Sequence, residues 1–448
     1  MQQKLQQQEK QLESLTLLIE ELRGMVFGKK KQKGESETKH QADETGKPDE
    51  RKNQRKKADR SNESYRRRAP SEDEVTDVYT HTLRHCPDCG GLVTAIKTII
   101  QYSEDLADLT QLARLLKRVE KHIITTGYCT RCKKRKSGFP INPQTTILGE
   151  NTKKFISYLI VIMRQSFEQV RCFLKDTANI SISDGEIVIS LDQYADKLKP
   201  ERERIRQRIR AAPGRHYDET IWKVQHGSFG NYGWATTPTE GEDTLFILGK
   251  SRGIGIAKQL RGEEDNQVGI TDDYAAYDNL FTYHQLCMSH PHRKLRDLHE
   301  SKVLTDERKT ACTETFKAFS HLDKTLEETR KTVYQKEVWL KKRTEYINRL
   351  KEIAILTPND PEKLQRIKRT LTEKAELYFT CLLTPGIPAD NNKEERKMRH
   401  LVLKRNVSLG SKSDKGAETM SILCTALLSC WWKKPDNFFI AYEQILIA

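Results

Sequence analysis

Three acidic residues lie far apart in the chain, each in a setting where a carboxylate could do chemistry. Asp218 interrupts an otherwise apolar-alternating run, Asp272 follows a short β-type run, and Glu395 lies where a helix is expected. A carboxylate inside a strand costs free energy unless it has a partner. Carboxylates from distant segments can together hold two Mg²⁺ or Mn²⁺ ions about 3.5–4 Å apart, which activates water and stabilises a leaving oxygen. The three acids are therefore candidate ligands of a catalytic metal centre.

A simpler interpretation of Glu395 is also open. Asn392 and Glu395 have the spacing of a helix capping box, and Arg399 lies four residues after the glutamate, which suits an ordinary ion pair. On spacing alone, the three acids are more often unrelated surface charges than parts of one site.

A second group of possible metal ligands follows the second aspartate. It consists of one cysteine and three histidines: His284, Cys287, His290 and His292. These side chains could bind zinc, although a turn with an incidental cysteine is somewhat more common.

Two Cys-x-x-Cys pairs lie in residues 76–142, Cys86 with Cys89 and Cys129 with Cys132. Their spacing lets two tight turns present four thiolates to one Zn²⁺. Because four thiolates leave no open coordination position, this zinc is expected to be structural. Two unlinked redox or free-thiol pairs are the alternative.

The charge of the chain favours a polyanionic partner. The 448 residues carry a formal net charge of +15, and binding along a phosphate backbone would release condensed counterions. Charge alone does not separate nucleic acid from an anionic membrane surface. Four basic residues directly after the second cysteine pair are candidates for gripping a DNA backbone: Lys133, Lys134, Arg135 and Lys136.

Residues 143–212 are expected to be helical, with polar breaks near Gln165 and near Asn179. Helices separated by such breaks can form a helix-turn-helix that reads the major groove, and Arg171 and Lys175 are then candidate DNA-binding side chains. Packing of three helices without any DNA contact gives the same pattern, so both interpretations stay open.

The N-terminal part is expected to lie outside the core. Heptad spacing of apolar residues in 1–28 predicts a short coiled coil that supports self-association, or an amphipathic helix docked on the chain's own core. Residues 29–75 are charged and poor in apolar side chains, which predicts a disordered linker. No apolar run approaches the roughly 20 residues of a membrane-spanning helix. The scattered cysteines suit a reducing compartment, so we expect a cytoplasmic protein.

The pattern changes from helical to β-type after Pro213-Gly214. Asp272 would follow a strand directly, at the end where α/β folds usually place chemistry. Residues 290–380 are charged and helical again. Five short runs have the composition of strands: Thr220–Val224, Gly233–Thr237, Thr244–Leu248, Val268–Thr271 and His284–Cys287.

Five ordered segments resemble insertion-sequence transposases of the IS66 family, which are of the DDE type. Two positions depart from the family's pattern: Asp273 replaces a usual glycine, and Met288-Ser289 replace a usual Trp-Ala pair. The similar segments are Tyr217–Thr220 with Trp222, Thr271–Tyr277, His284–Leu298, Pro385–Pro388, and Asn391–Arg396 with Leu403–Arg405.

The resemblance implies that Asp218, Asp272 and Glu395 are the catalytic acids, with Glu395 favoured over Glu394. It also implies an α/β, RNase H-like catalytic core over residues 213–425, with a large helical insertion at about 299–384 and a C-terminal tail over 426–448. Ahead of this core, we expect the coiled coil, the charged linker, the zinc module and the helical region, in this order.

The resemblance implies a DNA transposase that cleaves element ends and transfers strands into target DNA with Mg²⁺ or Mn²⁺. Double-stranded DNA would be its partner, and the active form would be a homo-oligomer. One alternative is a catalytically inactive relative that acts as a DNA-binding regulatory or accessory protein. Another is a zinc-stabilised, coiled-coil interaction protein, which the positive charge disfavours.

Overall fold

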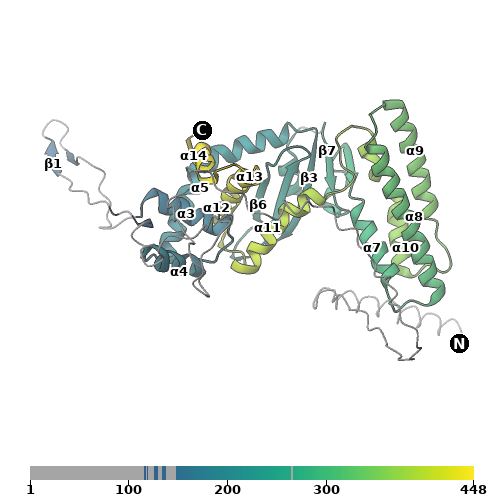
Figure 1. Cartoon of the computed structure of the whole chain (residues 1–448), viewed down its shortest axis with the longest axis horizontal. Coiled ribbons are helices and arrows are strands. Elements are labelled where there is room, and N and C mark those ends of the chain that lie inside the picture. The colour runs from purple at the N-terminus through teal and green to yellow at the C-terminus, as the bar shows by residue number, and fades with distance from the viewer. Residues whose placement is uncertain are drawn as a thin grey trace, which may run out of the picture. The chain divides into compact units, whose positions relative to one another are not determined.

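A computed structural model describes residues 116, 117, 119, 126–129, 134–137, 148–263 and 266–447 (Figure 1). The predicted coiled coil, the linker and the first cysteine pair lie outside these residues. Strands β1 (Thr126–Cys129) and β2 (Lys134–Ser137) form an antiparallel hairpin, so Cys129 is the last residue of a strand.

Three helices precede the main sheet: α3 (Glu150–Val161), α4 (Phe167–Ala178) and α5 (Asp184–Arg210). The sequence places their boundaries well because two capping boxes start helices there. The side chain of Ser166 caps α4 and that of Ser183 caps α5, each with a partner three residues later. The first half of α5 packs in this helical region, and its second half, around Ile205 and Ile209, packs against the sheet.

The central sheet has five strands in the order β6-β5-β3-β7-β8. Strand β5 is antiparallel to both of its neighbours, β3 and β6, whereas β7 and β8 run parallel to β3. The mixed sheet and its helices make an α/β fold (Figure 1). The strands are β3 (Gly214–Ile221), β5 (Tyr232–Pro238), β6 (Leu245–Lys250), β7 (Val268–Thr271) and β8 (Tyr283–Leu286).

Each face of the sheet has its own apolar cluster. On one face, Tyr217 and Trp234 pack with the end of α5, α6 (Ile254–Arg261) and the short 3-10 helix η4 (Ala275–Tyr277). On the opposite face, Ala235 and Phe246 pack against α11 (Asn392–Ser408) and α12 (Asp414–Leu423). Side chains alternate along a strand, so Asp218 faces the α11 side and Glu219 the other side.

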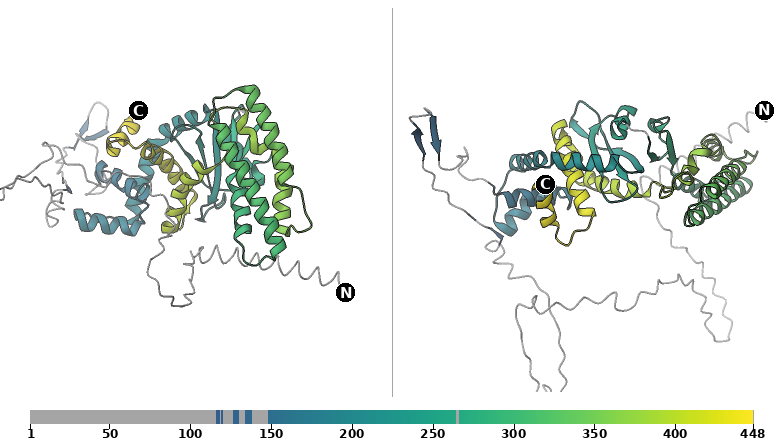
Figure 2. Two further views of the ribbon diagram at one scale, coloured as in Figure 1. Left: turned by 45° about the vertical axis from the view of Figure 1, so that its right-hand side comes forward. Right: turned by 90° about the horizontal axis from the view of Figure 1, so that it is seen from above.

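Helices fill the long interval between β8 and α11. The helices α8, α9 and α10 run side by side (Figures 1 and 2) and share a buried cluster with η5 and with α7, which directly follows β8. Gln285 of β8 fixes η5 to the sheet, because its Nε2 donates to the carbonyl of Tyr378 and its Oε1 accepts the N–H of Cys381. The helices are α7 (Ser289–Glu300), α8 (Asp306–Arg330), α9 (Lys336–Ile353), α10 (Glu362–Glu373) and η5 (Ala375–Leu382).

The C-terminal helices cover the sheet's edge strand β6. The hydroxyls of Ser421, Thr425 and Ser429 accept backbone N–H groups of β6 and of Thr244 just before it, at 2.9–3.0 Å. This ladder satisfies donors that an open edge would expose. The elements here are α11 (Asn392–Ser408), β9 (Ser411–Ser413), which pairs with β4 (Val224–His226), α12 (Asp414–Leu423), η6 (Cys424–Leu428), α13 (Ser429–Trp432) and α14 (Phe438–Ile447).

The expected strand at Thr220–Val224 was wrong in its position. The observed strand β3 begins at Gly214 and ends at Ile221, so Asp218 lies inside it. Its first half was missed because it contains the polar residues Arg215 and His216, which are buried with hydrogen-bond partners from distant segments. In the described part of the chain, no helix is long and apolar enough to span a membrane.

Candidate active site at the ends of two parallel strands

Asp218 and Asp272 lie side by side across two parallel strands. The last recorded partners of β3 and β7 are His216 and Ile270, and the same register continued by two residues places Asp218 opposite Asp272. Neighbouring strands are about 4.8 Å apart. Two acids that are 54 positions apart in the sequence therefore meet at the same level of the sheet.

The environment of Asp218 opposes its ionisation. Burial raises the pKa of Asp218 well above its usual range, and the carboxylates of Glu219, Glu394 and Asp272 raise it further. The N–H of Glu219 donates to Oδ1 of Asp218 at 2.9 Å and partly offsets these effects. Because a divalent cation would stabilise two such carboxylates in their charged form, this pair fits a Mg²⁺ or Mn²⁺ site.

Asp272 and its neighbour Asp273 have different partners. Burial raises the pKa of Asp272, and its Oδ1 accepts the N–H of Tyr274 at 3.1 Å. Asp273 instead pairs with Lys374, whose Nζ lies 2.7 Å from its Oδ1. Lys374 follows α10, so Asp273 connects the strand end to the helices between β8 and α11.

Glu219, the other half of the acidic pair on β3, has partners of its own. Its carboxylate lies 2.8 Å from Nη2 of Arg252 and accepts the hydroxyl of Tyr277 at 2.8 Å. Its side chain is buried on the face opposite to Asp218, which explains why an acidic pair can interrupt this strand.

Asn391 joins the start of α11 to both strand ends. Its Nδ2 donates to the carbonyl of Tyr217 at 2.8 Å, and its Oδ1 accepts from Nδ1 of His216 at 2.9 Å. Its backbone N–H donates to Sγ of Cys287 at 3.1 Å. Cys287 comes one residue after β8, and the register of β7 with β8 places it opposite Asp272. The first turn of α11 is therefore held at the level of the two aspartates.

The two glutamates of that turn have different surroundings. Glu394 is fully buried. Its carboxylate makes no hydrogen bond of ordinary geometry to the described residues, although the hydroxyl of Thr237 lies near enough to lower its pKa. Burial raises the pKa of Glu394 to about 7. Glu395 is about one-quarter exposed, and its Oε1 lies 2.6 Å from Nη2 of Arg293 on α7.

The capping-box interpretation of Glu395 was wrong. The helix N-cap is Asn391, and no side-chain hydrogen bond caps this helix. The glutamate pairs with Arg293, which is 102 positions away in sequence and follows β8. Glu395 thus faces the strand ends, and the structure brings it next to Cys287 and His290.

Cys287, His290 and Glu395 form a cluster in which one ligand atom from each side chain lies within 4.8 Å of the others. The predicted set of His284, Cys287, His290 and His292 does not come together. His284 Nε2 bonds to Thr271 Oγ1 at 2.8 Å, and His292 Nε2 bonds to Ser320 of α8 at 3.0 Å. Two of the four residues therefore meet, and Glu395 completes the group.

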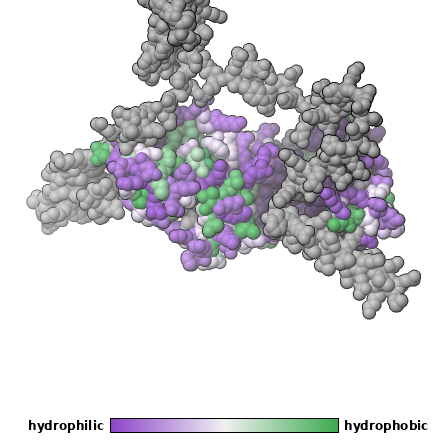
Figure 3. Space-filling model, turned by 60° about the horizontal axis from the view of Figure 1, so that its bottom comes forward, coloured by the Kyte–Doolittle hydropathy of each residue, from purple (hydrophilic) through white to green (hydrophobic). Residues whose placement is uncertain are grey.

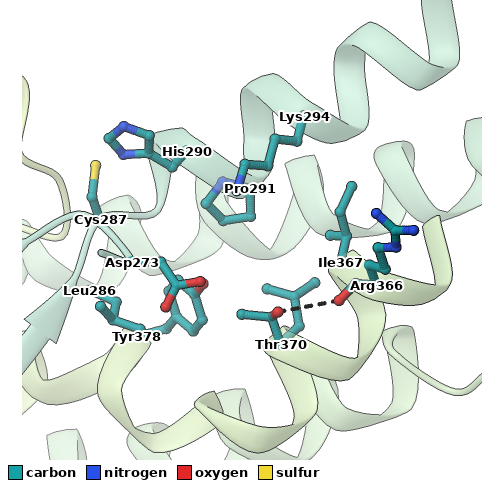
Figure 4. A pocket seen from close by; sticks show the side chains of 11 residues that line it. Asp273, Leu286, Cys287, His290, Pro291, Lys294, Arg366, Ile367, Thr370 and Tyr378 are labelled. Atoms are coloured by element: carbon teal, nitrogen blue, oxygen red, sulfur yellow. Dashed lines mark hydrogen bonds between the residues drawn. The ribbon is translucent and has the colours of Figure 1, made fainter. Parts of the chain in front are cut away.

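A cavity of about 110 Å³ opens beside this cluster (Figure 4). Figure 4 shows Cys287 and His290 at one end and Arg366 and Ile367 of α10 at the other. Its wall includes the ring of Tyr378 and its rim includes Lys294. The cavity therefore lies between the strand ends and the helices α7, α10 and η5.

The predicted DNA-binding side chains of α4 are at the surface. Arg171 Nε lies 3.0 Å from Oδ1 of Asp184, and Lys175 donates to Oδ1 of Asn179 at 2.8 Å. Hydrophilic residues dominate the face shown in Figure 3, with hydrophobic residues in small groups. Lys134, Arg135 and Lys136 belong to strand β2, and Lys133 lies outside the described residues.

The predicted zinc ligands are not placed by the structure. Cys86, Cys89 and Cys132 lie outside the described residues, and only the backbone of Cys129 is described, at the end of β1.

Two residues of the site, Asn391 and Arg293, were missed in the sequence. They lie in segments that carry the family resemblance, so their position beside candidate ligands was the available signal. Glu394 was weighed against Glu395 as the third acid, but its burial could not be predicted, because it depends on which face of α11 packs against the sheet.

Comparison with known families gives one match over this region. A family described as "Transposase IS66 family" matches residues 162–419, from the end of α3 to the middle of α12. No match is found among curated proteins.

Proposed function

The chain belongs to the IS66 family of transposases, and from this premise we propose that it cleaves DNA at element ends and joins the freed ends to target DNA. The observation that supports this most directly is the parallel register of β3 and β7, which, continued by two residues, places Asp218 opposite Asp272. Glu395 is the third acid of the proposed site, on the first turn of α11.

We further assign the sheet to an RNase H-like core. Three antiparallel strands followed by two parallel ones, in the order β6-β5-β3-β7-β8, support this assignment. The helices α8 to η5 would then be an insertion between the second aspartate and the glutamate. An acidic site at the carboxyl end of β7, beside the middle of β3, agrees with the usual position of chemistry in α/β sheets.

Asp218, Asp272 and Glu395 would hold Mg²⁺ or Mn²⁺. When bound, these ions supply electrophilic stabilisation of the phosphate and of the attacking and leaving oxygens. The two aspartates have raised pKa values and lie side by side, so their donor set suits a hard divalent cation. Asn391 would keep α11 in register with the strands, and Arg293 would compensate the charge of Glu395 until metal binds.

The remaining parts of the chain would hold DNA. Arg171 and Lys175 on α4 and the basic residues 133–136 would contact phosphates, and the predicted Cys86–Cys132 zinc module would be structural. Two ends must be joined in one reaction, so we expect a homo-oligomer at work.

The test is metal-dependent cleavage of DNA that contains the element's ends. Asp218→Asn should abolish cleavage and leave DNA affinity within about twofold, since the basic side chains proposed to contact the phosphates are unchanged. A wild-type chain that binds end DNA but never cuts it in Mg²⁺ or Mn²⁺ would identify an inactive, DNA-binding relative instead.

A further inference from the structure

Cys287, His290 and Glu395 present the three donor types that a transition metal prefers. One ligand atom from each lies within 4.8 Å of the others. In a tetrahedral zinc site, ligands at about 2.0–2.3 Å from the ion are roughly 3.5 Å apart. A contraction of about 1 Å, within reach of side-chain rotation, would close the group around one ion.

The surroundings of His290 suit coordination of a metal ion by its imidazole. Its Nδ1 is buried and has no hydrogen-bond partner among the described residues. Its Nε2 lies 3.4 Å from Nη2 of Arg293 and 3.8 Å from Oε1 of Glu395. Because Nδ1 makes no hydrogen bond to the described residues, the ring can turn to coordinate an ion without breaking a bond at that nitrogen.

A hydrogen bond from the start of α11 fixes the thiol of Cys287. Its Sγ accepts the N–H of Asn391 at 3.1 Å, and the side chain is almost fully buried. Figure 4 shows Cys287 and His290 near one another at the end of the cavity. The cavity gives the fourth coordination position access to a water or a phosphate oxygen, because a site with three protein ligands stays open.

We infer that Cys287, His290 and Glu395 form a site for Zn²⁺ or another borderline metal, distinct from the proposed Mg²⁺ site but sharing Glu395 with it. Sulfur and imidazole donors select zinc or cobalt over magnesium. The second half of the inference rests on the proposed function: zinc bound here withdraws Glu395 from the two aspartates and inhibits cleavage.

Arg293 is the competitor for this site in the metal-free protein. Its Nη2 lies 2.6 Å from Oε1 of Glu395, so a metal ion must displace this guanidinium. Removing it should therefore strengthen metal binding, whereas removing a ligand should weaken it.

The first experiment counts tightly bound Zn²⁺ per full-length chain by mass spectrometry after dialysis. The wild type and Cys312→Ala should hold one more equivalent than Cys287→Ala. Cys312 is a matched control because it is equally buried, in α8. His290→Ala tests the same site with a partly exposed residue should Cys287→Ala fail to fold. Equal zinc content in the wild type and in the folded site variants would overturn the inference.

Cobalt gives a spectroscopic readout of the same site. The wild type should show a thiolate-to-cobalt absorption band that is larger than that of Cys287→Ala by the contribution of one thiolate. Arg293→Ala should reach the same band at a lower Co²⁺ concentration. A difference spectrum without a thiolate band would exclude Cys287 as a ligand.

The second experiment measures inhibition of Mg²⁺-dependent cleavage by Zn²⁺. Half-inhibition of Cys287→Ala, relative to its own uninhibited rate, should need at least about tenfold more zinc than the wild type. The same inhibition curve for Cys287→Ala and the wild type would show that zinc does not inhibit by competing for Glu395. If the wild type does not cleave DNA at all, the proposed function fails, and the zinc count still decides whether the site exists.

Discussion

Asp272 and Asp273 are adjacent in sequence but have different partners in the fold. Asp272 accepts the N–H of Tyr274 and lies opposite Asp218, whereas Asp273 forms an ion pair with Lys374. The family resemblance left two aspartates at a position where one is usual. The strand register separates them, since only Asp272 continues β7 at the level of Asp218.

We therefore predict that Asp272→Asn abolishes metal-dependent cleavage and that Asp273→Asn does not. Loss of a metal ligand should reduce the cleavage rate by at least ~10³-fold, whereas loss of the partly exposed pair with Lys374 should cost less than about 1 kcal/mol of stability. Cleavage assays and urea unfolding of both variants check the two parts. Equal loss of cleavage in the two variants would contradict the assignment.

The neighbouring glutamates of α11 allow a similar comparison. Glu395→Gln should abolish cleavage, because its carboxylate faces Cys287 and His290 at the strand ends. Glu394→Gln should retain cleavage within about tenfold, since it keeps the shape of a side chain that makes no ordinary hydrogen bond. Rates measured over a range of Mg²⁺ concentrations distinguish the two. Activity in Glu395→Gln combined with its absence in Glu394→Gln would transfer the role to Glu394.

Asn391 should act as a positioning residue. Asn391→Ala removes the bonds to His216 and Tyr217 and leaves two buried polar groups without partners, which costs about 1–3 kcal/mol. The Mg²⁺ concentration for half-maximal cleavage should also rise, because α11 would no longer hold Glu395 near the aspartates. Asn392→Ala, one residue later, is the control and should change neither quantity appreciably. A variant that is only less stable, with unchanged Mg²⁺ dependence, would reduce Asn391 to a structural role.

The strand ends of the site were predictable because they depend on local patterns. The runs before Asp272 and around residues 244–248 alternate or cluster apolar residues as strands do, and the structure has strands there. The polar breaks expected near Gln165 and Asn179 likewise fall just before α4 and α5, whose starts are fixed by capping boxes at Ser166 and Ser183. Local chemistry is sufficient where the partners are a few residues apart.

The contacts that complete the site could not be predicted in this way. Arg293 and Glu395 are 102 residues apart, and Asn391 and His216 are 175 residues apart. No periodicity connects such residues, because their meeting depends on how α7 and α11 pack on the sheet. The same reason explains the missed start of β3, where Arg215 is buried against Gln267 and the carbonyl of Arg261.

His400 should make stability depend on pH. Burial lowers the pKa of His400 to about 4, and the neutral ring is satisfied, with Nε2 donating to the carbonyl of Val161 and Nδ1 accepting from Arg164. In the unfolded chain, the imidazole of His400 takes up a proton below about pH 6.5. In the folded chain, it does so only near pH 4. The contribution of His400 to the free energy of unfolding is therefore largest above pH 6.5 and falls on acidification, by on the order of 3 kcal/mol.

Urea unfolding of the wild type and of His400→Gln between pH 4 and 7.5 checks this prediction. The free energy of unfolding of His400→Gln should depend less on pH over this range than that of the wild type. His226→Gln is the control, because His226 is exposed on β4. Parallel profiles for the wild type and His400→Gln would show that other groups cause the acid sensitivity.

A buried ion pair should stabilise the helical insertion. Nζ of Lys368 donates to both carboxylate oxygens of Asp360 at 2.9 and 3.0 Å and to the carbonyl of Ile355 at 3.0 Å, and both charged side chains are almost fully buried. Asp360→Ala leaves the ammonium group buried without its counter-ion, so we expect a loss of about 3–5 kcal/mol in unfolding free energy.

Two further variants test whether charge causes this loss. Glu362→Ala, which removes the exposed pair with Arg366 on the same helix, should cost less than about 1 kcal/mol. The double variant Asp360→Leu with Lys368→Met should recover much of the loss, because it removes both charges together. Denaturant unfolding of all three variants measures these differences, and a double variant as unstable as Asp360→Ala would show that packing, not charge, holds this segment.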